Sequence, residues 1–362
     1  MNDEENVAPE EHPQNMGEMV ETKNRRPWLT YTLISICVGV AVLNGFSTDL
    51  MLMTIFGAKV NDLIADGEYW RLVTSVFLHF GALHLAFNML FLYNMGPVLE
   101  SIFGRWRYLV IYLTAGVMGS VASFAFSNSI SVGASGALFG LMGSLLYFWL
   151  SNPELGKRIG KDIIILLAFN IIFGLVNKSV DNWAHFGGLV GGFLTSAFVG
   201  LPGEAVSRYK KVAALAGLCI LTGLGITYGL QLESSPARSN FALQRRLNLA
   251  EYLIEKKDYT GASTQAQKVL AREPGSPLAH YLLAVAYMGR NDYKSAVSEL
   301  KMVVQARPDL PEVHFYLGYS LAKLGNKAEA IIHLSEAVRV KPDQALFKQT
   351  LESVKNNQPL PE

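Results

Sequence analysis

The chain has 362 residues, of which 50% are hydrophobic and 17% are charged. Soluble domains carry about 25% charged residues, so this composition excludes an ordinary soluble enzyme and a disordered chain. The length predicts two or more folding units. A formal net charge of +1 gives no electrostatic support for nucleic-acid binding. Both cysteines, Cys37 and Cys219, lie in apolar runs, which predicts no disulfide framework, zinc site or redox motif.

Residues 1–26 are polar and acidic and become basic at their end. This composition is typical of a disordered tail and is unlike an Arg-rich, acid-poor transit peptide. Apolar stretches follow, and we interpret them as membrane spans, because about 20 apolar residues cross a bilayer and about 17 can suffice. The predicted spans are residues 27–46, 82–102, 106–127, 135–150, 162–176, 182–201 and 212–231.

The cations of the loops predict the orientation of these spans, because Lys and Arg favour the cytoplasmic side. Eleven cations precede the first span or lie in the loops after the second, fourth and sixth spans, whereas three lie in the other loops. We therefore expect a multi-pass membrane protein with a cytoplasmic amino terminus and an extracytoplasmic carboxyl-terminal part. The composition of the tail favours a bacterial plasma membrane.

The connection formed by residues 47–81 mixes apolar and acidic residues. Loops of this length without structure of their own are uncommon and usually functional. We expect this loop to fold on, or partly into, the outer leaflet. Within it, Trp70 is expected to anchor the loop at the interface, and Arg71 is expected to hold the loop through main-chain carbonyl groups.

The last 120 residues are charged and periodic. Two sets of residues recur at a spacing of 34: Pro274, Pro308 and Pro342, and Ala262, Ala296 and Ala330. Small residues at fixed places, with a proline closing each unit, are the signature of tetratricopeptide repeat (TPR) helix pairs. We predict a linker at residues 232–242, then three repeats and a capping helix over residues 243–356. Concave helical arrays of this kind bind proteins or peptides.

Polar groups inside membrane spans are costly and are functional candidates by default. The second span opens with His79, His84 and Asn88, the fourth contains Ser135, and the sixth contains His185. These three spans run in the same direction, so the polar groups are expected at a similar depth, near the outer surface. A serine becomes a nucleophile when a base takes its proton, so a serine and a histidine are the minimum for acyl transfer.

The histidines do not have the spacing of a metal site. His84 and Asn88 are four residues apart and share one helix face, whereas His79 is rotated by about 140° from His84 if the helix extends that far. Neither cysteine nor carboxylate completes a ligand set. We therefore expect no metal and no other cofactor.

Glycines near the candidate residues allow two interpretations. Gly133, Gly136 and Gly140 in the fourth span, and Gly187, Gly188, Gly191 and Gly192 in the sixth, are small-residue faces that are common in membrane helix bundles. In the more specific interpretation, these two spans pack backbone to backbone, which brings Ser135 within hydrogen-bond reach of His185. Glycines on both sides of Ser135 also leave its N–H free for an oxyanion.

Together these motifs resemble the rhomboid intramembrane serine proteases over roughly residues 28–231. The elements are Trp70-Arg71, His-x4-His-x3-Asn at residues 79–88, Gly-x-Ser-Gly-x3-Gly at residues 133–140 and Ala-His-x2-Gly-x3-Gly at residues 184–192. The resemblance implies an all-α membrane bundle of six plus one helices, here followed by a TPR α-solenoid. It further implies cleavage of transmembrane segments of membrane proteins near the outer face.

By this resemblance, Ser135 is the nucleophile, His185 is the general base and acid, and the Ser135 N–H, His84 and Asn88 form the oxyanion hole. The supporting residues are Gly133, Gly136, Phe139, Trp70, Arg71, His79 and Gly188. His79 and Glu100 are expected to be mainly structural.

The sequence departs from some family members at Phe139, where they carry tyrosine. Position i+4 faces the same side as Ser135, so the ring can pack against His185, although the hydroxyl is lost. Asp181 lies four residues before His185 and could orient it. The family works with a Ser–His dyad, however, and we interpret Asp181 as a loop charge.

Two other functions remain open. A catalytically inactive rhomboid-like protein could bind or deliver membrane clients through its repeats, although the presence of both Ser135 and His185 favours an enzyme. A transporter would show inverted-repeat symmetry and deeper polar residues, and neither is evident in the sequence.

Overall fold

The computed structural model describes residues 26–152, 164–165, 168, 172, 174, 176–177 and 180–361. The chain forms two compact units, Met1–Ser235 and Pro236–Glu362. The described residues form helices, and their one strand-like feature is an isolated antiparallel bridge between Lys59 and Ser131. The all-α prediction is confirmed. The predicted tail lies outside the described residues, apart from its last position.

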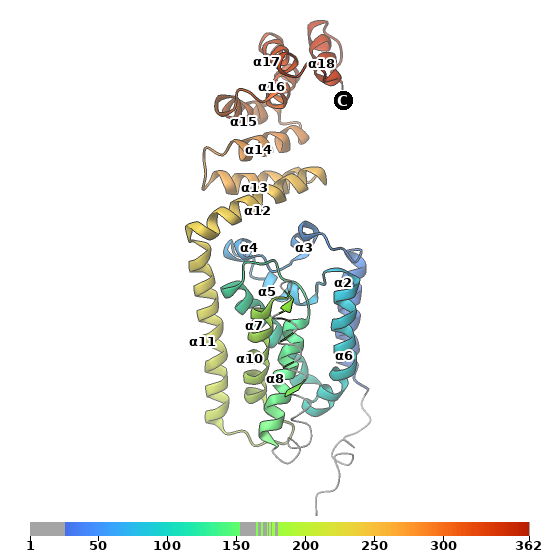
Figure 1. Cartoon of the computed structure of the whole chain (residues 1–362), viewed down its shortest axis with the longest axis vertical. Coiled ribbons are helices and arrows are strands. Elements are labelled where there is room, and N and C mark those ends of the chain that lie inside the picture. Colours follow the sequence, from blue (N-terminus) through green and yellow to red (C-terminus); the bar gives the residue numbers. More distant parts are fainter. Residues whose placement is uncertain are drawn as a thin grey trace, which may run out of the picture. The chain divides into compact units, whose positions relative to one another are not determined.

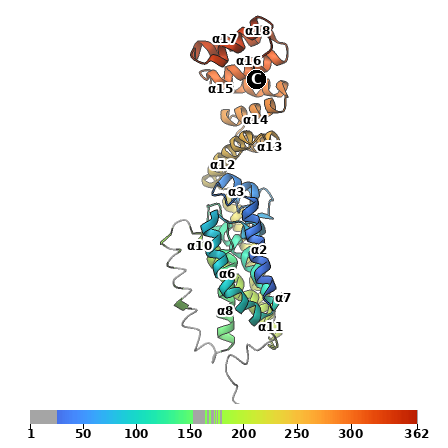
Figure 2. The ribbon, with the colours of Figure 1, turned by 90° about the vertical axis from the view of Figure 1, so that its right-hand side faces the viewer.

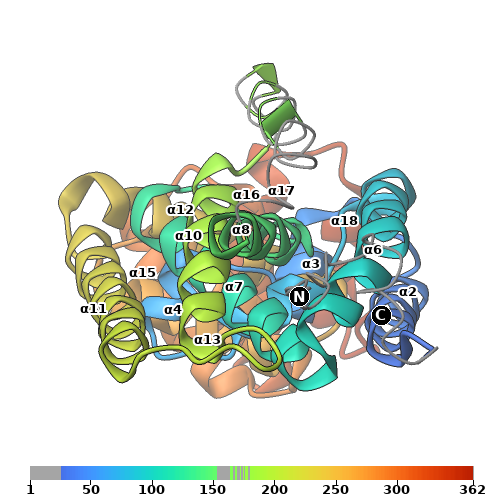
Figure 3. The ribbon, with the colours of Figure 1, turned by 90° about the horizontal axis from the view of Figure 1, so that it is seen from below.

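The first unit is a bundle of apolar helices. They are α2 (Trp28–Leu43), α6 (Gly81–Phe103), α7 (Arg105–Phe126), α8 (Ser135–Ser151), α10 (Asn182–Val199) and α11 (Arg208–Glu233). Figures 1 and 3 show α2 beside α6 on one flank and α11 on the other, with α7, α8 and α10 between them. Among the described residues, α6, α7 and α11 are long and apolar enough to cross a membrane. Six of the seven predicted spans correspond to these helices. Most of the remaining one, the fifth span at residues 162–176, lies outside the described residues.

The centre of the bundle depends on glycine. A Cβ atom on Gly188 of α10 would overlap the carbonyl oxygen of Gly136 on α8, and one on Gly192 would overlap that of Gly140. Small residues at these positions allow the two backbones to meet directly. The prediction that the two glycine-rich spans pack backbone to backbone is confirmed.

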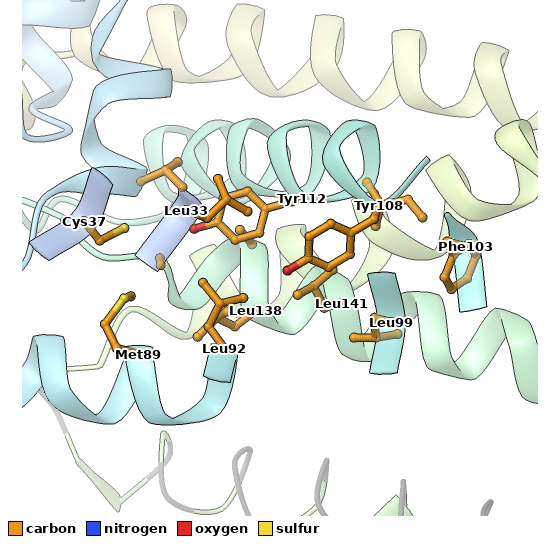
Figure 4. Close-up of a cluster of buried hydrophobic side chains, with 14 of the residues drawn as sticks. Leu33, Cys37, Met89, Leu92, Leu99, Phe103, Tyr108, Tyr112, Leu138 and Leu141 are labelled. Carbon is orange, nitrogen blue, oxygen red and sulfur yellow. The ribbon is translucent and has the colours of Figure 1, made fainter. Parts of the chain in front are cut away.

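The side-chain core of the first unit lies between α2, α6, α7 and α8 (Figure 4). It is built from aromatic and aliphatic residues, with Tyr108 and Tyr112 fully buried among leucines. Near the carboxyl end of α6, Glu100 accepts hydrogen bonds from the Thr30 N–H (2.9 Å) and the Thr30 hydroxyl (2.9 Å). Glu100 therefore ties α2 to α6, which confirms its predicted structural role.

The long first loop carries short helices of its own. These are α3 (Leu50–Phe56), α4 (Asn61–Ala65), α5 (Arg71–Thr74) and the 3-10 helix η1 (Ser75–Phe77). Arg71 Nη1 donates to the carbonyl oxygens of Thr54 (2.6 Å) and Ala58 (3.1 Å), and Arg71 Nε donates to Glu68 (2.8 Å). The predicted role of Arg71 in holding the loop through carbonyl groups is therefore confirmed. Trp70 is 48% exposed, and its anchoring role at the membrane interface stays a prediction.

The second unit consists of successive helix pairs, which Figure 2 shows one after another. The helices are α12 (Pro236–Glu255), α13 (Tyr259–Leu270), α14 (Pro277–Gly289), α15 (Tyr293–Ala306), α16 (Pro311–Lys323), α17 (Lys327–Val340) and α18 (Ala345–Lys355). Ala262, Ala296 and Ala330, the small residues of the 34-residue period, are fully buried. The TPR prediction is confirmed, and α18 occupies the place of the capping helix.

The predicted linker at residues 232–242 differs from the structure. Helix α11 continues to Glu233 and α12 begins at Pro236, so only Ser234 and Ser235 lie between them. The polar composition of this stretch predicted a linker, but Pro236 begins a helix, and proline is favoured at the first helical position. Burial of Ala242 and Leu243 then stabilises this first part of α12.

Candidate active site

Ser135 and His185 lie at the amino-terminal ends of two packed helices. Ser135 is the first residue of α8, and His185 is in the first turn of α10. The Nε2 atom of His185 is 2.9 Å from the Oγ atom of Ser135. When Nε2 carries no proton, it can accept the serine hydroxyl hydrogen. The glycine contacts between α8 and α10 produce this short distance between residues 50 positions apart.

Phe139 lies one turn after Ser135 and packs on the imidazole of His185. The ring centroids are 4.0 Å apart and the ring planes differ by 13°. This confirms the predicted contact between the two rings. The stack restricts the orientation of His185 through a flat apolar surface, without the hydroxyl that a tyrosine would add.

Asp181 caps α10. One carboxylate oxygen accepts the Ala184 N–H at 3.1 Å, and the other accepts a short hydrogen bond from the Ser123 hydroxyl. Both contacts serve the start of the helix and its attachment to α7. They favour interpreting Asp181 as a capping charge rather than as a third catalytic member.

His84 lies directly against the segment that precedes Ser135. Gly133 has a φ of +129°, and a Cβ atom there would lie 2.8 Å from Cε1 and 3.0 Å from Nε2 of His84. Glycine is therefore required at this position both for its backbone conformation and for the space that the imidazole occupies. The Nδ1 atom of His84 accepts the Phe80 N–H at 3.4 Å. In this tautomer Nε2 carries the ring proton and can donate it.

Asn88 and His79 flank His84. Asn88 is one turn later on the same face of α6, and its amide donates to the His84 carbonyl at 2.8 Å. The ring of His79 meets that of His84 edge-on at 5.4 Å, and His79 Nε2 accepts the Ala134 N–H at 3.4 Å. His79 thus supports the residue just before Ser135, which agrees with its predicted structural role.

Most of the predicted residues lie around the serine. Ser135, His185, Phe139, Gly133 and His84 converge on one place. His79 and Asn88 adjoin His84, and Gly136 and Gly188 form the helix contact beside the serine. The contacts of Trp70 and Arg71 are instead with the first loop, where the guanidinium of Arg71 lies 4.5 Å from the centroid of the Trp70 ring. The two residues therefore shape the loop rather than touch the serine.

Sequence reasoning missed the residues that hold the main chain just before the nucleophile. The Ser75 carbonyl accepts the Gly133 N–H at 2.9 Å, and the spacing of side chains in the sequence cannot predict such a contact. Sequence reasoning also did not single out Lys59. Its side chain is fully buried, and a buried ammonium group requires a specific set of partners, but the burial becomes evident only in the folded chain.

The fold and site define a class of protein, a polytopic helical membrane protein with a Ser–His pair near the ends of two helices. A family model described as "Rhomboid domain" matches residues 66–202, and two models described as "Tetratricopeptide repeat" match residues 253–314 and 311–344.

Curated relatives agree with this class. The rhomboid protease GluP of Bacillus subtilis is 39% identical over 268 residues, which are 73% of this chain and 52% of that protein. The putative rhomboid protease YdcA of the same organism is 40% identical over 136 residues, which are 37% of this chain and 68% of that protein. The chain belongs to the rhomboid family and is an integral membrane protein. It spans about half the length of GluP.

Proposed function

We propose that the chain is an intramembrane serine endopeptidase that cleaves transmembrane segments of membrane proteins. The observation that carries this proposal is the 2.9 Å separation of His185 Nε2 and Ser135 Oγ. Relatives named as rhomboid proteases support the same conclusion. The pair supplies a nucleophile and a base, the minimum for acyl transfer.

In the proposed reaction, the Ser135 oxygen attacks the scissile carbonyl carbon while His185 Nε2 takes the hydroxyl proton. The resulting imidazolium then protonates the leaving amine as the peptide bond breaks. Water, activated by His185, releases the acyl group from Ser135. The substrate must be locally unwound, because the carbonyl groups of a helix are engaged in its own hydrogen bonds.

The negative charge that develops on the carbonyl oxygen needs donors. Ser135 opens α8, and the N–H groups of a first helical turn have no intrahelical partners and lie at the positive end of the helix dipole. The Nε2–H of His84 adjoins the segment before Ser135. Asn88 lies one turn after His84 on α6, and its amide donates to the His84 carbonyl. We assign the oxyanion to the Ser135 N–H, His84 and Asn88.

The proposed domain plan combines a cytoplasmic tail, a seven-helix membrane domain over residues 27–231 and an extracytoplasmic TPR domain, in a bacterial plasma membrane. The TPR domain would bind a protein partner or a substrate region, since helical arrays offer extended concave surfaces.

The test is cleavage of a single-span model substrate in proteoliposomes by the wild type, Ser135→Ala and His185→Ala. The wild type should cleave the substrate and take a serine-directed fluorophosphonate label, and both variants should be silent. Full proteolysis by Ser135→Ala would contradict the assignment. A wild type that neither cleaves several substrates nor takes the label would favour an inactive, client-binding protein.

A further inference from the structure

We propose that Lys59 is a positioning residue for the nucleophile, because it holds the main chain that leads from α7 to Ser135. This inference rests on the proposed function, since it concerns the same serine. Lys59 lies in the first loop between α3 and α4, and its side chain is fully buried. A buried ammonium group is costly unless its surroundings compensate for the lost water, and the segment next to the nucleophile supplies part of this compensation.

The main chain of Lys59 forms the first connection. The Lys59 N–H donates to the Ser131 carbonyl at 2.9 Å, and the Ser131 N–H donates to the Lys59 carbonyl at 3.1 Å. This pair of hydrogen bonds is the isolated antiparallel bridge of the structure. It fixes the register of the loop against a residue four positions before Ser135.

The ammonium group of Lys59 forms the second connection. Its Nζ atom lies 2.8 Å from the Ser129 carbonyl oxygen and 3.4 Å from those of Ser123 and Ser127. These carbonyl groups belong to the last turn of α7 and the residues after it, where a helix carries negative partial charge and leaves acceptors unsatisfied. A cation at this place therefore fixes both the end of α7 and the start of the next segment.

Asn61 extends this contact set. Its carbonyl oxygen accepts from Lys59 Nζ at 2.8 Å, and its amide donates to the Ser127 carbonyl at 2.9 Å. The same amide donates to Glu233, the last residue of α11, at 3.2 Å. We call Lys59, Asn61, Glu233 and the carbonyl groups of residues 123–129 the Lys59 cluster. It joins the first loop to the ends of α7 and α11.

The second half of the segment is also held by the first loop, because the Gly133 N–H donates to Ser75 and the Ala134 N–H donates to His79. The main chain between α7 and Ser135 is thus attached to the loop along its length, with Lys59 responsible for the first half. A displacement of about 1 Å at reacting groups can cost about 100-fold in rate. Loss of the Lys59 cluster should therefore lower kcat, while substrate binding elsewhere is little changed.

The experiment compares the full-length wild type with Lys59→Met, which keeps the side-chain length and removes the charge. The matched control is Thr30→Val. It removes a buried hydroxyl that is bonded to Glu100, near the carboxyl end of α6 and away from His84 at the start of that helix. In proteoliposomes, Lys59→Met should lower kcat and the second-order rate of fluorophosphonate labelling about tenfold or more, with KM within about twofold. Thr30→Val should retain both rates, even if it lowers the melting temperature as much as Lys59→Met does.

A second variant covers the case in which Lys59→Met does not fold. Asn61→Leu removes the bonds of the Asn61 side chain to the ammonium, to the Phe124 and Ser127 carbonyl groups and to Glu233. It leaves the main-chain bridge, and it should lower the same two rates by a smaller factor. Wild-type rates in Lys59→Met or in Asn61→Leu, or losses no greater than those of an equally destabilised Thr30→Val, would overturn the role of Lys59 while leaving the enzyme assignment intact. A wild type that neither cleaves nor labels would instead overturn the proposed function.

Discussion

The two units of the chain use small residues for different purposes. In the membrane unit, Gly136 and Gly188 allow two helix backbones to touch, and this contact brings together side chains 50 positions apart in the sequence. In the TPR unit, Ala262 and Ala296 fill equivalent positions in successive helix pairs. The first use creates one particular site, whereas the second repeats the same local contact.

The polar contacts of the two units show the same contrast. In the membrane unit, Glu100 and Lys59 are buried and hold elements that are distant in sequence. In the TPR unit, Asp258 and Asp292 make equivalent helix caps 34 residues apart. A site therefore depends on non-repeating, long-range contacts, while a solenoid tolerates local change one repeat at a time. This contrast can be tested by substitutions in each unit.

The largest effect is expected from Gly188→Ala. The added Cβ atom would overlap the Gly136 carbonyl, so α8 and α10 must separate and Ser135 must move away from His185. We expect proteolysis to fall by about 100-fold or more. The matched control is Gly223→Ala on α11, where a Cβ atom meets nothing within 4 Å. Equal activity of the two variants in the proteoliposome assay would contradict the backbone-contact explanation.

An effect of similar size is expected from His84→Ala. Removal of one oxyanion donor typically lowers kcat by about 100- to 1,000-fold, and KM should change little because the donor acts mainly on the transition state. Steady-state kinetics on a model substrate check this prediction. A variant with raised KM and unchanged kcat would show that His84 binds substrate rather than stabilising the oxyanion.

A smaller effect is expected from Phe139→Leu. Aromatic pairs contribute about 0.5–1.5 kcal/mol beyond simple burial, so loss of the stack on His185 should lower kcat by about 2- to 12-fold. Phe139→Tyr keeps the ring and serves as the control, with activity close to that of the wild type. If Phe139→Leu is as active as Phe139→Tyr, the stack does not orient the base.

The smallest expected effect is a loss of stability of the TPR unit at low pH. His314 Nδ1 and His333 Nδ1 are 3.1 Å apart. Burial lowers the pKa of His333 below its ordinary value, and the neighbouring His314 and Lys301 lower it further. The charge of Glu329 opposes this shift only in part. The unfolded chain then binds more protons than the folded one, so stability is full above the ordinary histidine pKa and falls as the pH drops below it.

Amide hydrogen exchange over residues 311–340 of the full-length chain measures this loss. Protection should decrease between pH 7.5 and pH 5, about the ordinary histidine pKa of 6.5, and His333→Asn should weaken the dependence. The preceding repeat, in which His280 contacts Glu299 at 2.5 Å, serves as an internal comparison. Its protection is measured in the same sample as that of residues 311–340. An unchanged pH dependence in His333→Asn would assign the effect to other groups.

The sequence by itself determined the elements whose signals are local. Hydropathy located α2, α6, α7, α8, α10 and α11, and a 34-residue period located the TPR helix pairs, because both signals arise from residues close together in the chain. The glycine pattern also predicted the packing of α8 on α10. The linker was misjudged, because the polar residues after Pro236 are compatible with a helix that only packing stabilises.

Only the tertiary structure decided how the nucleophile segment is held. Gly133 meets His84, Ser131 pairs with Lys59, and Asp181 caps its own helix while reaching Ser123. These contacts involve main-chain atoms or single side chains from distant elements, which leave no periodic or spacing signal in the sequence. A hydrogen bond to a carbonyl group depends on where the backbone lies and not on which residue bears it, so the chain must fold before such a partner is defined.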